Sequence, residues 1–162
     1  MKDESIVKEI SYMLFSMIAA MMLTIMPLPT WAIWYRPQWL LLVIIFWLLT
    51  APHRIGLSTV WVIGLLLDVL QGTLLGEHTL AMVVIAYIVI KLYRQISSFL
   101  LWQQAVMIGL LTMIYQSIIV IIQGVSGDMV LTWKYWLSSL VTLLLWPIVY
   151  TILQNYSRKL KI

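Results

Sequence analysis

Six apolar segments, separated by short polar loops, constrain this chain more than any other feature of its sequence. A helix that crosses a bilayer needs about 20 predominantly apolar residues, with a range of roughly 17 to 25. The segments cover residues 10–26, 38–52, 55–70, 79–93, 102–122 and 133–153. They predict an all-α integral membrane protein with six transmembrane helices, organised as a single transmembrane domain over residues 1–162.

Composition supports a lipid environment and narrows the chemistry. Of the 162 residues, 63% are hydrophobic and 10% are charged, whereas a soluble domain has roughly 25% charged residues. A soluble domain of this size still leaves about a third of its unfolded surface in water, so it could not hide this much apolar surface. The chain has no cysteine, which excludes disulfides and thiolate metal sites.

The first apolar segment has some features of a cleavable signal peptide. Lys2 and Lys8 precede it, as basic residues precede the apolar region of a signal sequence. However, no small-x-small cleavage site follows, and the sequence continues as PLPTW. We therefore interpret the segment as an uncleaved first span.

Basic residues divide unequally between the two sets of predicted loops. One set contains Arg36 and Lys134, and the other contains Lys2, Lys8, Arg54, Lys91, Arg94, Arg158, Lys159 and Lys161. Loops rich in Lys and Arg stay in the cytoplasm, so both termini are predicted to be cytoplasmic. We attribute the net charge of +4 to this topology and to contact with anionic lipid, and not to nucleic-acid binding.

One carboxylate, Asp68, lies inside the third apolar segment. It is 14 residues beyond Arg54, or about 21 Å along a helix, which places it in the outer third of the membrane. An acid there costs about 2–3 kcal/mol on insertion scales, so it normally faces the bundle interior and has a partner. Arg36, Tyr115 and Gln116 are the candidate partners.

Glycines surround this aspartate at a regular spacing. Gly64, Asp68, Gly72 and Gly76 recur every four residues, which would place them on one helix face. Small residues on such a face let a neighbouring backbone approach closely. The pattern predicts a packing seam, against this chain's own helices or a partner, in which Asp68→Asn is tolerated if hydrogen bonding is its purpose. Alternatively, Gly72 and Gly76 shape an outer turn, because QGTLLGEH contains turn residues.

Arg36 and Pro37 begin the second apolar segment. Proline suits a helix start, since it has a fixed φ and no amide to leave unpaired. We interpret Arg36 either as an interfacial residue whose long side chain reaches water, or as a buried partner of Asp68 or Glu77.

The remaining polar residues do not form an enzyme active site. His53 and His78 are predicted on opposite sides of the membrane, so they cannot share a metal, and Glu77 beside His78 is interpreted as a solvated loop pair. One acid and no histidine within the spans cannot supply the groups of an intramembrane protease. The sequence therefore predicts no catalytic residue, no cofactor and no metal.

Four stretches carry a resemblance to a known family. YRPQWLLLVIIFWLLTAPHRIGL, GLLLDVLQGTLLGEHTL and the later LWQQA and LLWP resemble the MreD family of rod shape-determining proteins of Gram-negative bacteria. The resemblance extends over nearly the whole chain. The residues that match the family motif are Arg36, Pro37, Pro52, Gly64, Asp68, Gly72 and Gly76.

This resemblance implies a function that the residues alone do not. It implies a non-enzymatic scaffold of the cell-elongation complex in the inner membrane, which binds MreC and helps control peptidoglycan synthesis. That complex connects cytoplasmic MreB filaments to the polymerase RodA and its class B penicillin-binding partner.

The resemblance also implies a fold similar to the substrate-binding subunit of energy-coupling factor transporters, whose six helices enclose an outer-facing pocket. Carried onto this chain, Arg36, Asp68 and Glu77 would lie near the mouth of that pocket. The alternative function is therefore a small-molecule or lipid-intermediate binding or transport subunit.

Overall fold

The computed structural model describes residues 2–127 and 132–160, which are all-helical with connecting turns. The α-helices are α1 (Lys2–Ile25), α2 (Trp39–Thr50), α3 (Leu57–Gln71), α4 (Glu77–Ser98), α5 (Leu101–Ser126) and α6 (Leu137–Leu160). Short 3-10 helices, η1 (Ile33–Tyr35) and η2 (Trp133–Trp136), precede α2 and α6. Lys161, counted among the basic residues above, lies outside the described residues.

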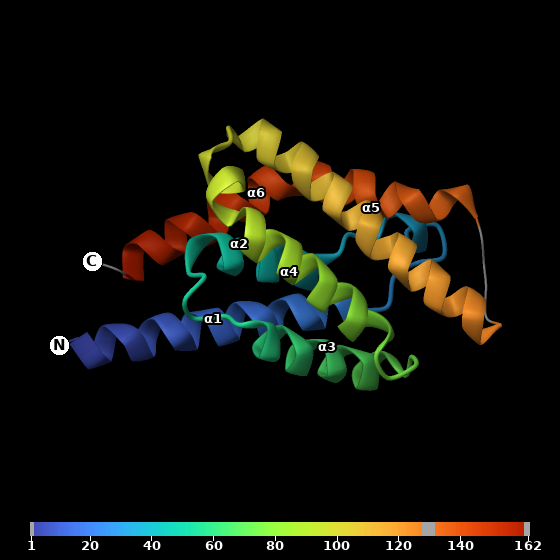
Figure 1. Cartoon of the computed structure of the whole chain (residues 1–162), viewed down its shortest axis with the longest axis horizontal. Helices are drawn as coiled ribbons and strands as arrows, with labels where there is room; N and C mark the ends of the chain where they lie inside the picture. The colour runs from blue at the N-terminus through green and yellow to red at the C-terminus, as the bar shows by residue number, and fades with distance from the viewer. Residues whose placement is uncertain (1, 128–131, 161–162) are drawn as a thin grey trace.

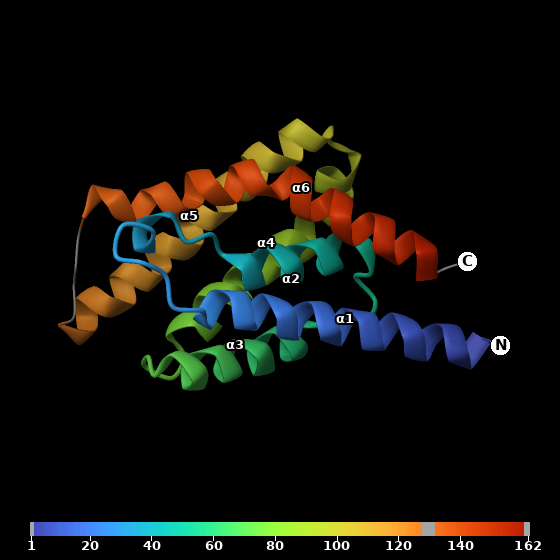
Figure 2. The ribbon, with the colours of Figure 1, turned by 180° about the vertical axis from the view of Figure 1, so that it is seen from behind.

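The helices form an elongated bundle with a clear polarity. The start of α1 and the end of α6 lie at the same end of the bundle (Figures 1 and 2). The opposite end, called the distal end below, brings together the end of α1, η1, the α3–α4 turn, the end of α5 and the start of α6 (Figure 1). Residues from most of the chain's length therefore meet at the distal end.

Five segments of the described chain are long and apolar enough to cross a membrane. They are α1, η1 with α2, α4, α5, and η2 with α6. The third helix, predicted as a span over residues 55–70, has 15 residues. Its length is about 22 Å, less than the hydrocarbon core of about 30 Å. The structure thus has the six helices expected, but α3 is shorter than a full span because a turn begins at Gly72.

The first helix differs from its prediction at its start. It begins at Lys2 and not at residue 10, so the charged N-terminal segment continues the helix. Asp3 and Glu4 lie in the first turn, where negative charge is favourable at the positive end of the helix dipole. Glu9 forms an ion pair with Arg54 of the α2–α3 turn at 3.1 Å, which ties the two segments together at this end.

The second helix is the core of the bundle. Every residue from 40 to 48 is buried, and α2 packs against α1, α4 and α6. A helix that is apolar on all sides is expected in such a position. The indole nitrogen of Trp47 donates a hydrogen bond to Ser16 of α1 at 2.9 Å, so this buried polar group has a partner.

Large apolar side chains cover the outside of the bundle. Examples on four helices are Phe15, Val69, Leu110 and Leu144, each more than half exposed. Soluble proteins rarely expose apolar surface this continuously. The exposed apolar faces and the five span-length segments fit a multi-pass membrane protein.

Candidate functional site

Asp68 lies in the last turn of α3 and is completely buried. Its carboxylate accepts hydrogen bonds from the backbone N–H groups of Gly76, His78 and Thr79 at 2.9, 3.0 and 3.4 Å. These N–H groups belong to the N-terminal end of α4, where a helix has no internal acceptors for them. Asp68 therefore caps α4 from the neighbouring helix, with its charge at the positive end of the α4 dipole.

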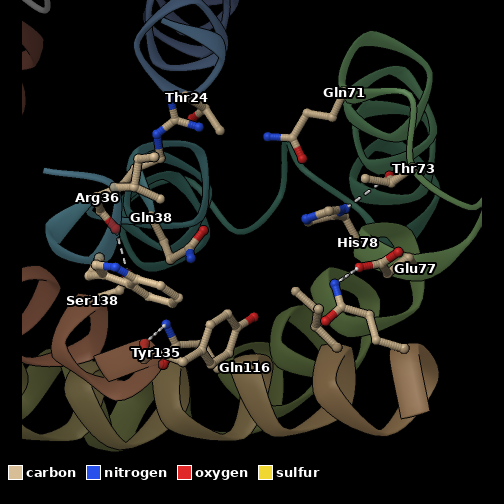
Figure 3. Close-up of a pocket in the computed structure, with 14 residues that line it drawn as sticks. Thr24, Arg36, Gln38, Gln71, Thr73, Glu77, His78, Gln116, Tyr135 and Ser138 are labelled. Atoms are coloured by element: carbon tan, nitrogen blue, oxygen red, sulfur yellow. Dashed lines mark hydrogen bonds between the residues drawn. The ribbon is translucent and has the colours of Figure 1, made fainter. Parts of the chain in front are cut away.

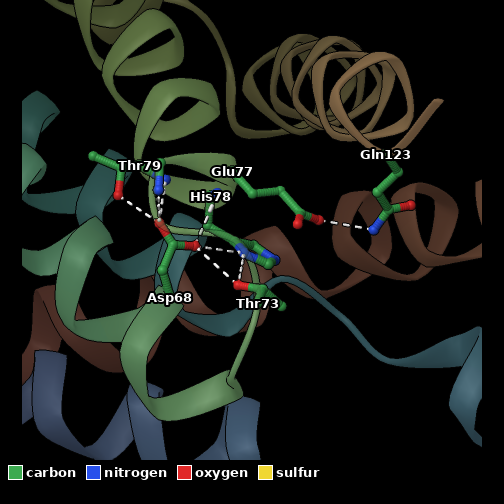
Figure 4. Close-up of polar contacts among 7 residues, drawn as sticks. Asp68, Thr73, Glu77, His78, Thr79 and Gln123 are labelled. Carbon is green, nitrogen blue, oxygen red and sulfur yellow. Dashed lines mark hydrogen bonds and ion pairs between the residues drawn. The ribbon is translucent and has the colours of Figure 1, made fainter. Parts of the chain in front are cut away.

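Three side chains complete the surroundings of this carboxylate (Figure 4). The Thr79 hydroxyl donates to Oδ2 of Asp68 at 2.7 Å, and the Thr73 hydroxyl donates to Oδ1 at 3.2 Å. His78 Nδ1 lies 2.9 Å from Oδ1, a distance at which an imidazole N–H donates to a carboxylate. We define the Asp68 cap as Asp68 with Thr73, Gly76, His78 and Thr79.

The cap changes what we expect of an asparagine at this position. Each oxygen of Asp68 accepts from at least one backbone N–H, which can only donate. The NH₂ group of an asparagine would face one of these donors and leave it unpaired. Asp68→Asn is therefore predicted to destabilise the protein, contrary to the expectation from the sequence.

The partners that the sequence suggested for Asp68 are not the ones it has. Among the described residues, Arg36, Tyr115 and Gln116 form no hydrogen bond with it. Its donors lie five to eleven residues further along the chain. The sequence does indicate where such donors lie, because turn residues precede the fourth apolar segment. A helix that begins after a turn presents backbone N–H groups without internal acceptors.

The glycines around Asp68 have two different roles. A Cβ added at Gly64 would lie 2.7 Å from the Cα of Thr79, so the missing side chain lets α3 and α4 approach closely. Gly72 and Gly76 have φ of +66° and +103°, which glycine adopts without strain. Gly72 ends α3 and Gly76 precedes α4. The turn alternative is therefore correct for these two, and the four residues do not form one helix face.

Glu77 and His78 are not the solvated pair that the sequence suggested. The side chain of Glu77 accepts a hydrogen bond from Gln123 Nε2 at 2.7 Å, and only 4% of the residue is exposed. This contact joins the start of α4 to α5. Nδ1 of His78 contacts the carboxylate of Asp68, and the opposite side of the ring faces a cavity (Figures 3 and 4).

A polar cavity of about 320 Å³ lies beside the Asp68 cap at the distal end (Figure 3). Its polar lining residues are Thr24, Arg36, Gln38, Gln71, Thr73, Glu77, His78, Gln116, Gln123, Tyr135 and Ser138. Ile33, Trp34 and Ile119 supply apolar surface. Of the three residues predicted around an outer pocket, Arg36 and Glu77 line this cavity, while Asp68 lies behind His78.

Arg36 makes hydrogen bonds to two different segments around the cavity. Its guanidinium donates to the carbonyl of Met26 after α1, and its own carbonyl accepts from the hydroxyl of Ser138 on α6. The ion pairs of the described residues do not include one between Arg36 and Asp68 or Glu77. Arg36 is therefore a structural link that also places a positive charge at the cavity.

Two residues that line this cavity have buried polar atoms without a hydrogen-bond partner. In the described part of the chain, four buried side-chain nitrogen or oxygen atoms have no hydrogen-bond partner. Two of them, Arg36 Nε and Gln116 Oε1, belong to cavity residues. Buried polar groups are nearly always hydrogen-bonded to protein or to water. Both atoms are almost fully buried, so a molecule in the cavity would reach them only after a side chain moves.

Comparison with known proteins gives a match over almost the same extent as the resemblance noted above. A family model described as rod shape-determining protein MreD matches residues 4–156. A rod shape-determining protein MreD of Haemophilus influenzae is 28% identical over 145 residues, which cover 90% of each chain. No solved structure matches the chain at a significant level. The family match includes the Asp68 cap and every residue of the cavity.

Proposed function

This chain belongs to the MreD family of rod shape-determining proteins, and from that premise we propose that it is a non-enzymatic scaffold of the cell-elongation complex in the bacterial inner membrane. Membership supports a role in rod shape determination, and the family is one of structural proteins. The observation that carries the proposal is the family match over residues 4–156.

In the proposed arrangement, both termini are cytoplasmic and the distal end faces outward. The start of α1 and the end of α6 lie together, and the basic residues Arg54, Arg158 and Lys159 belong to segments at that end (Figure 1). Basic segments of this kind stay in the cytoplasm. We also propose a fold similar to the substrate-binding subunits of energy-coupling factor transporters, which the open polar cavity at the distal end supports.

The proposed direct partner is MreC, bound through its single transmembrane helix, with MreB, RodA and a class B penicillin-binding protein in the same complex. The seam around Gly64 is not available to such a helix, because Thr79 of α4 already occupies it. Asp68 is likewise buried within the chain. The partner must therefore dock on another surface.

We place the partner helix in an apolar groove between α1 and α6. This groove has a volume of about 390 Å³ and is floored by Trp39 and Val43 of α2. The α1 side contributes Ser16, Ala19 and Ala20. Small residues let a second helix come close enough for extensive van der Waals contact, which drives helix association in lipid.

Filling the groove tests the proposal. Ala19→Trp should abolish co-purification with MreC in detergent and should fail to restore rod shape in cells that lack the protein. Val106→Trp, on an exposed face of α5, is the matched control and should retain both properties. Thermal unfolding of each purified variant checks the fold.

Two outcomes would contradict this assignment. If Ala19→Trp is folded and still binds MreC, the groove is not the docking surface. If the unsubstituted protein neither binds MreC nor restores rod shape, the scaffold role itself is wrong.

A further inference from the structure

The distal cavity has opposite charges on opposite walls. Arg36 approaches from the segment between η1 and α2, and Glu77 from the start of α4 (Figure 3). The two side chains lie across the cavity from each other and form no ion pair. A molecule in the cavity would therefore meet a positive charge at one wall and a negative charge at the other.

His78 adds a hydrogen-bond acceptor to the negative wall. Its Nδ1 lies 2.9 Å from Asp68, which places a proton on Nδ1, and in the neutral ring Nε2 is then an acceptor. The ring extends into the cavity with this second nitrogen directed toward the open space (Figure 3). Glu77 and His78 together suit a group with several N–H donors, such as an ammonium.

The space between the charged walls is lined by side-chain amides. Gln38, Gln71 and Gln116 each offer a donor and an acceptor, as a peptide group does. Gln116 is completely buried, and its Nε2 donates to the carbonyl of Tyr135 at 3.3 Å while its Oε1 has no partner. On the opposite wall, the Arg36 Nε–H is a buried donor without an acceptor. Both atoms are buried behind the cavity surface, so a ligand would pair with them only after the two side chains rotate.

We propose that this cavity binds a small zwitterion of the amino-acid or short-peptide class, with its carboxylate toward Arg36 and its ammonium toward Glu77 and His78. A simple anion or cation would compensate only one wall, and leaving the other charge desolvated is costly. The volume of about 320 Å³ is at the lower end for small-molecule sites. This binding activity goes beyond the scaffold role and uses a different surface from the α1–α6 groove.

Triglycine and its capped forms test the proposal on the full-length protein in detergent. Binding is measured by calorimetry and by the rise in melting temperature. Triglycine should bind saturably. N-acetyl-triglycine and triglycine amide should each bind at least about tenfold more weakly, because each loses one charge-assisted hydrogen bond. The form capped at both ends should bind most weakly.

Variants assign each end of the peptide to a wall. Arg36→Gln should remove the preference for a free carboxylate, and Glu77→Gln should remove the preference for a free amine. The matched controls are Arg94→Gln and Glu4→Gln, which change exposed residues far from the cavity. The controls should leave both preferences intact.

A further variant avoids the structural role of Arg36. Gln116→Leu removes a buried amide of the cavity lining, together with its hydrogen bond to the Tyr135 carbonyl, without altering either charge, and it should weaken triglycine binding about tenfold. Gln95→Leu, at an exposed position on α4, is its control. Equal binding of all four peptides, or no saturable binding by any of them, would overturn the proposal.

The ethanolamine headgroup of a lipid has similar chemistry, with a phosphate in place of the carboxylate. Nanodiscs of phosphatidylethanolamine and of phosphatidylglycerol separate this source from a soluble zwitterion. Stabilisation by phosphatidylethanolamine alone, lost in Arg36→Gln and Glu77→Gln and without any triglycine binding, would overturn the peptide assignment in favour of a lipid headgroup.

Discussion

The Asp68 cap and the distal cavity are adjacent polar regions that share His78, yet they are built in opposite ways. In the cap, three hydrogen bonds reach each oxygen of the Asp68 carboxylate. At the cavity, Arg36 Nε and Gln116 Oε1 are buried without a partner. A buried polar residue in a membrane protein therefore does not by itself indicate a binding site. The satisfied groups of the cap hold the fold, whereas the charged side chains Arg36 and Glu77 line a cavity that a ligand can enter.

The distal cavity also depends on the Asp68 cap. The cap joins the end of α3 to the start of α4 and orients the His78 ring through Nδ1. The other side of the same ring forms part of the cavity wall. A rigid α3–α4 turn therefore gives the cavity a fixed wall, and damage to the cap should affect both regions.

The largest effect is expected from Asp68→Leu. It removes the acceptor of three backbone N–H groups and two hydroxyls in a buried site, so unfolding should become easier by about 3–5 kcal/mol. The free energy of unfolding in detergent, measured by denaturant titration, checks this value. Asp3→Leu, at an exposed position of α1, should change it by less than about 0.5 kcal/mol. A loss below about 1 kcal/mol for Asp68→Leu would contradict the capping role.

Asp68→Asn should have a smaller effect than the leucine variant. It retains one acceptor oxygen but places an NH₂ group against a backbone N–H, at a cost of about 1–3 kcal/mol. Denaturant titration of both variants in detergent measures the difference between their free energies of unfolding. Stability equal to that of the unsubstituted protein would show that hydrogen bonding to one oxygen is sufficient.

Gly64→Ala tests the close approach of α3 and α4 that positions the cap. The new Cβ would lie 2.7 Å from the Thr79 Cα, so the helices must separate, and we expect a loss of about 1–3 kcal/mol. Gly56→Ala is the control because the nearest atom, Ser58 Oγ, would be 3.7 Å away. Equal effects of the two substitutions on the unfolding free energy would show that close packing at Gly64 is not important.

The smallest effect on stability is expected at the cavity. Gln116→Leu removes an amide whose oxygen has no partner and whose Nε2 makes a single hydrogen bond, to the Tyr135 carbonyl at 3.3 Å, so its net cost should be about 1 kcal/mol. Gln104→Leu should cost more, because that amide, whose oxygen also has no partner, donates to two carbonyls, those of Ile96 and Phe99 at 3.1 and 3.4 Å. If Gln116→Leu is the more damaging of the two, its amide stabilises the fold and the contrast between the two regions fails.

Several features of the fold and the site follow from sequence because they depend on local composition. Apolar segments form helices in lipid, where every backbone group needs an internal partner. The expectation that Asp68 is buried and hydrogen-bonded is confirmed for the same reason. The sequence offered two alternatives for Gly72 and Gly76, a helix face or a turn. Their positive φ values confirm the turn.

Other features could not be predicted because they depend on which segments meet. The donors to Asp68 are backbone groups, and their availability depends on the residue at which α4 begins. Glu77 is buried because Gln123, 46 residues away, reaches it from α5. Arg36 joins Ser138 over a separation of 102 residues. No short-range pattern in the sequence encodes these contacts.

The amino-acid sequence is enough to identify a helical membrane protein with a partnered acid in its third apolar segment, because an apolar chain in lipid has few ways to satisfy its polar groups. Which groups satisfy that acid, and which charged side chains line the distal cavity, depends on the packing of the helices. Hydrogen bonds act over about 3 Å, and only packing of the helices brings distant residues to that separation.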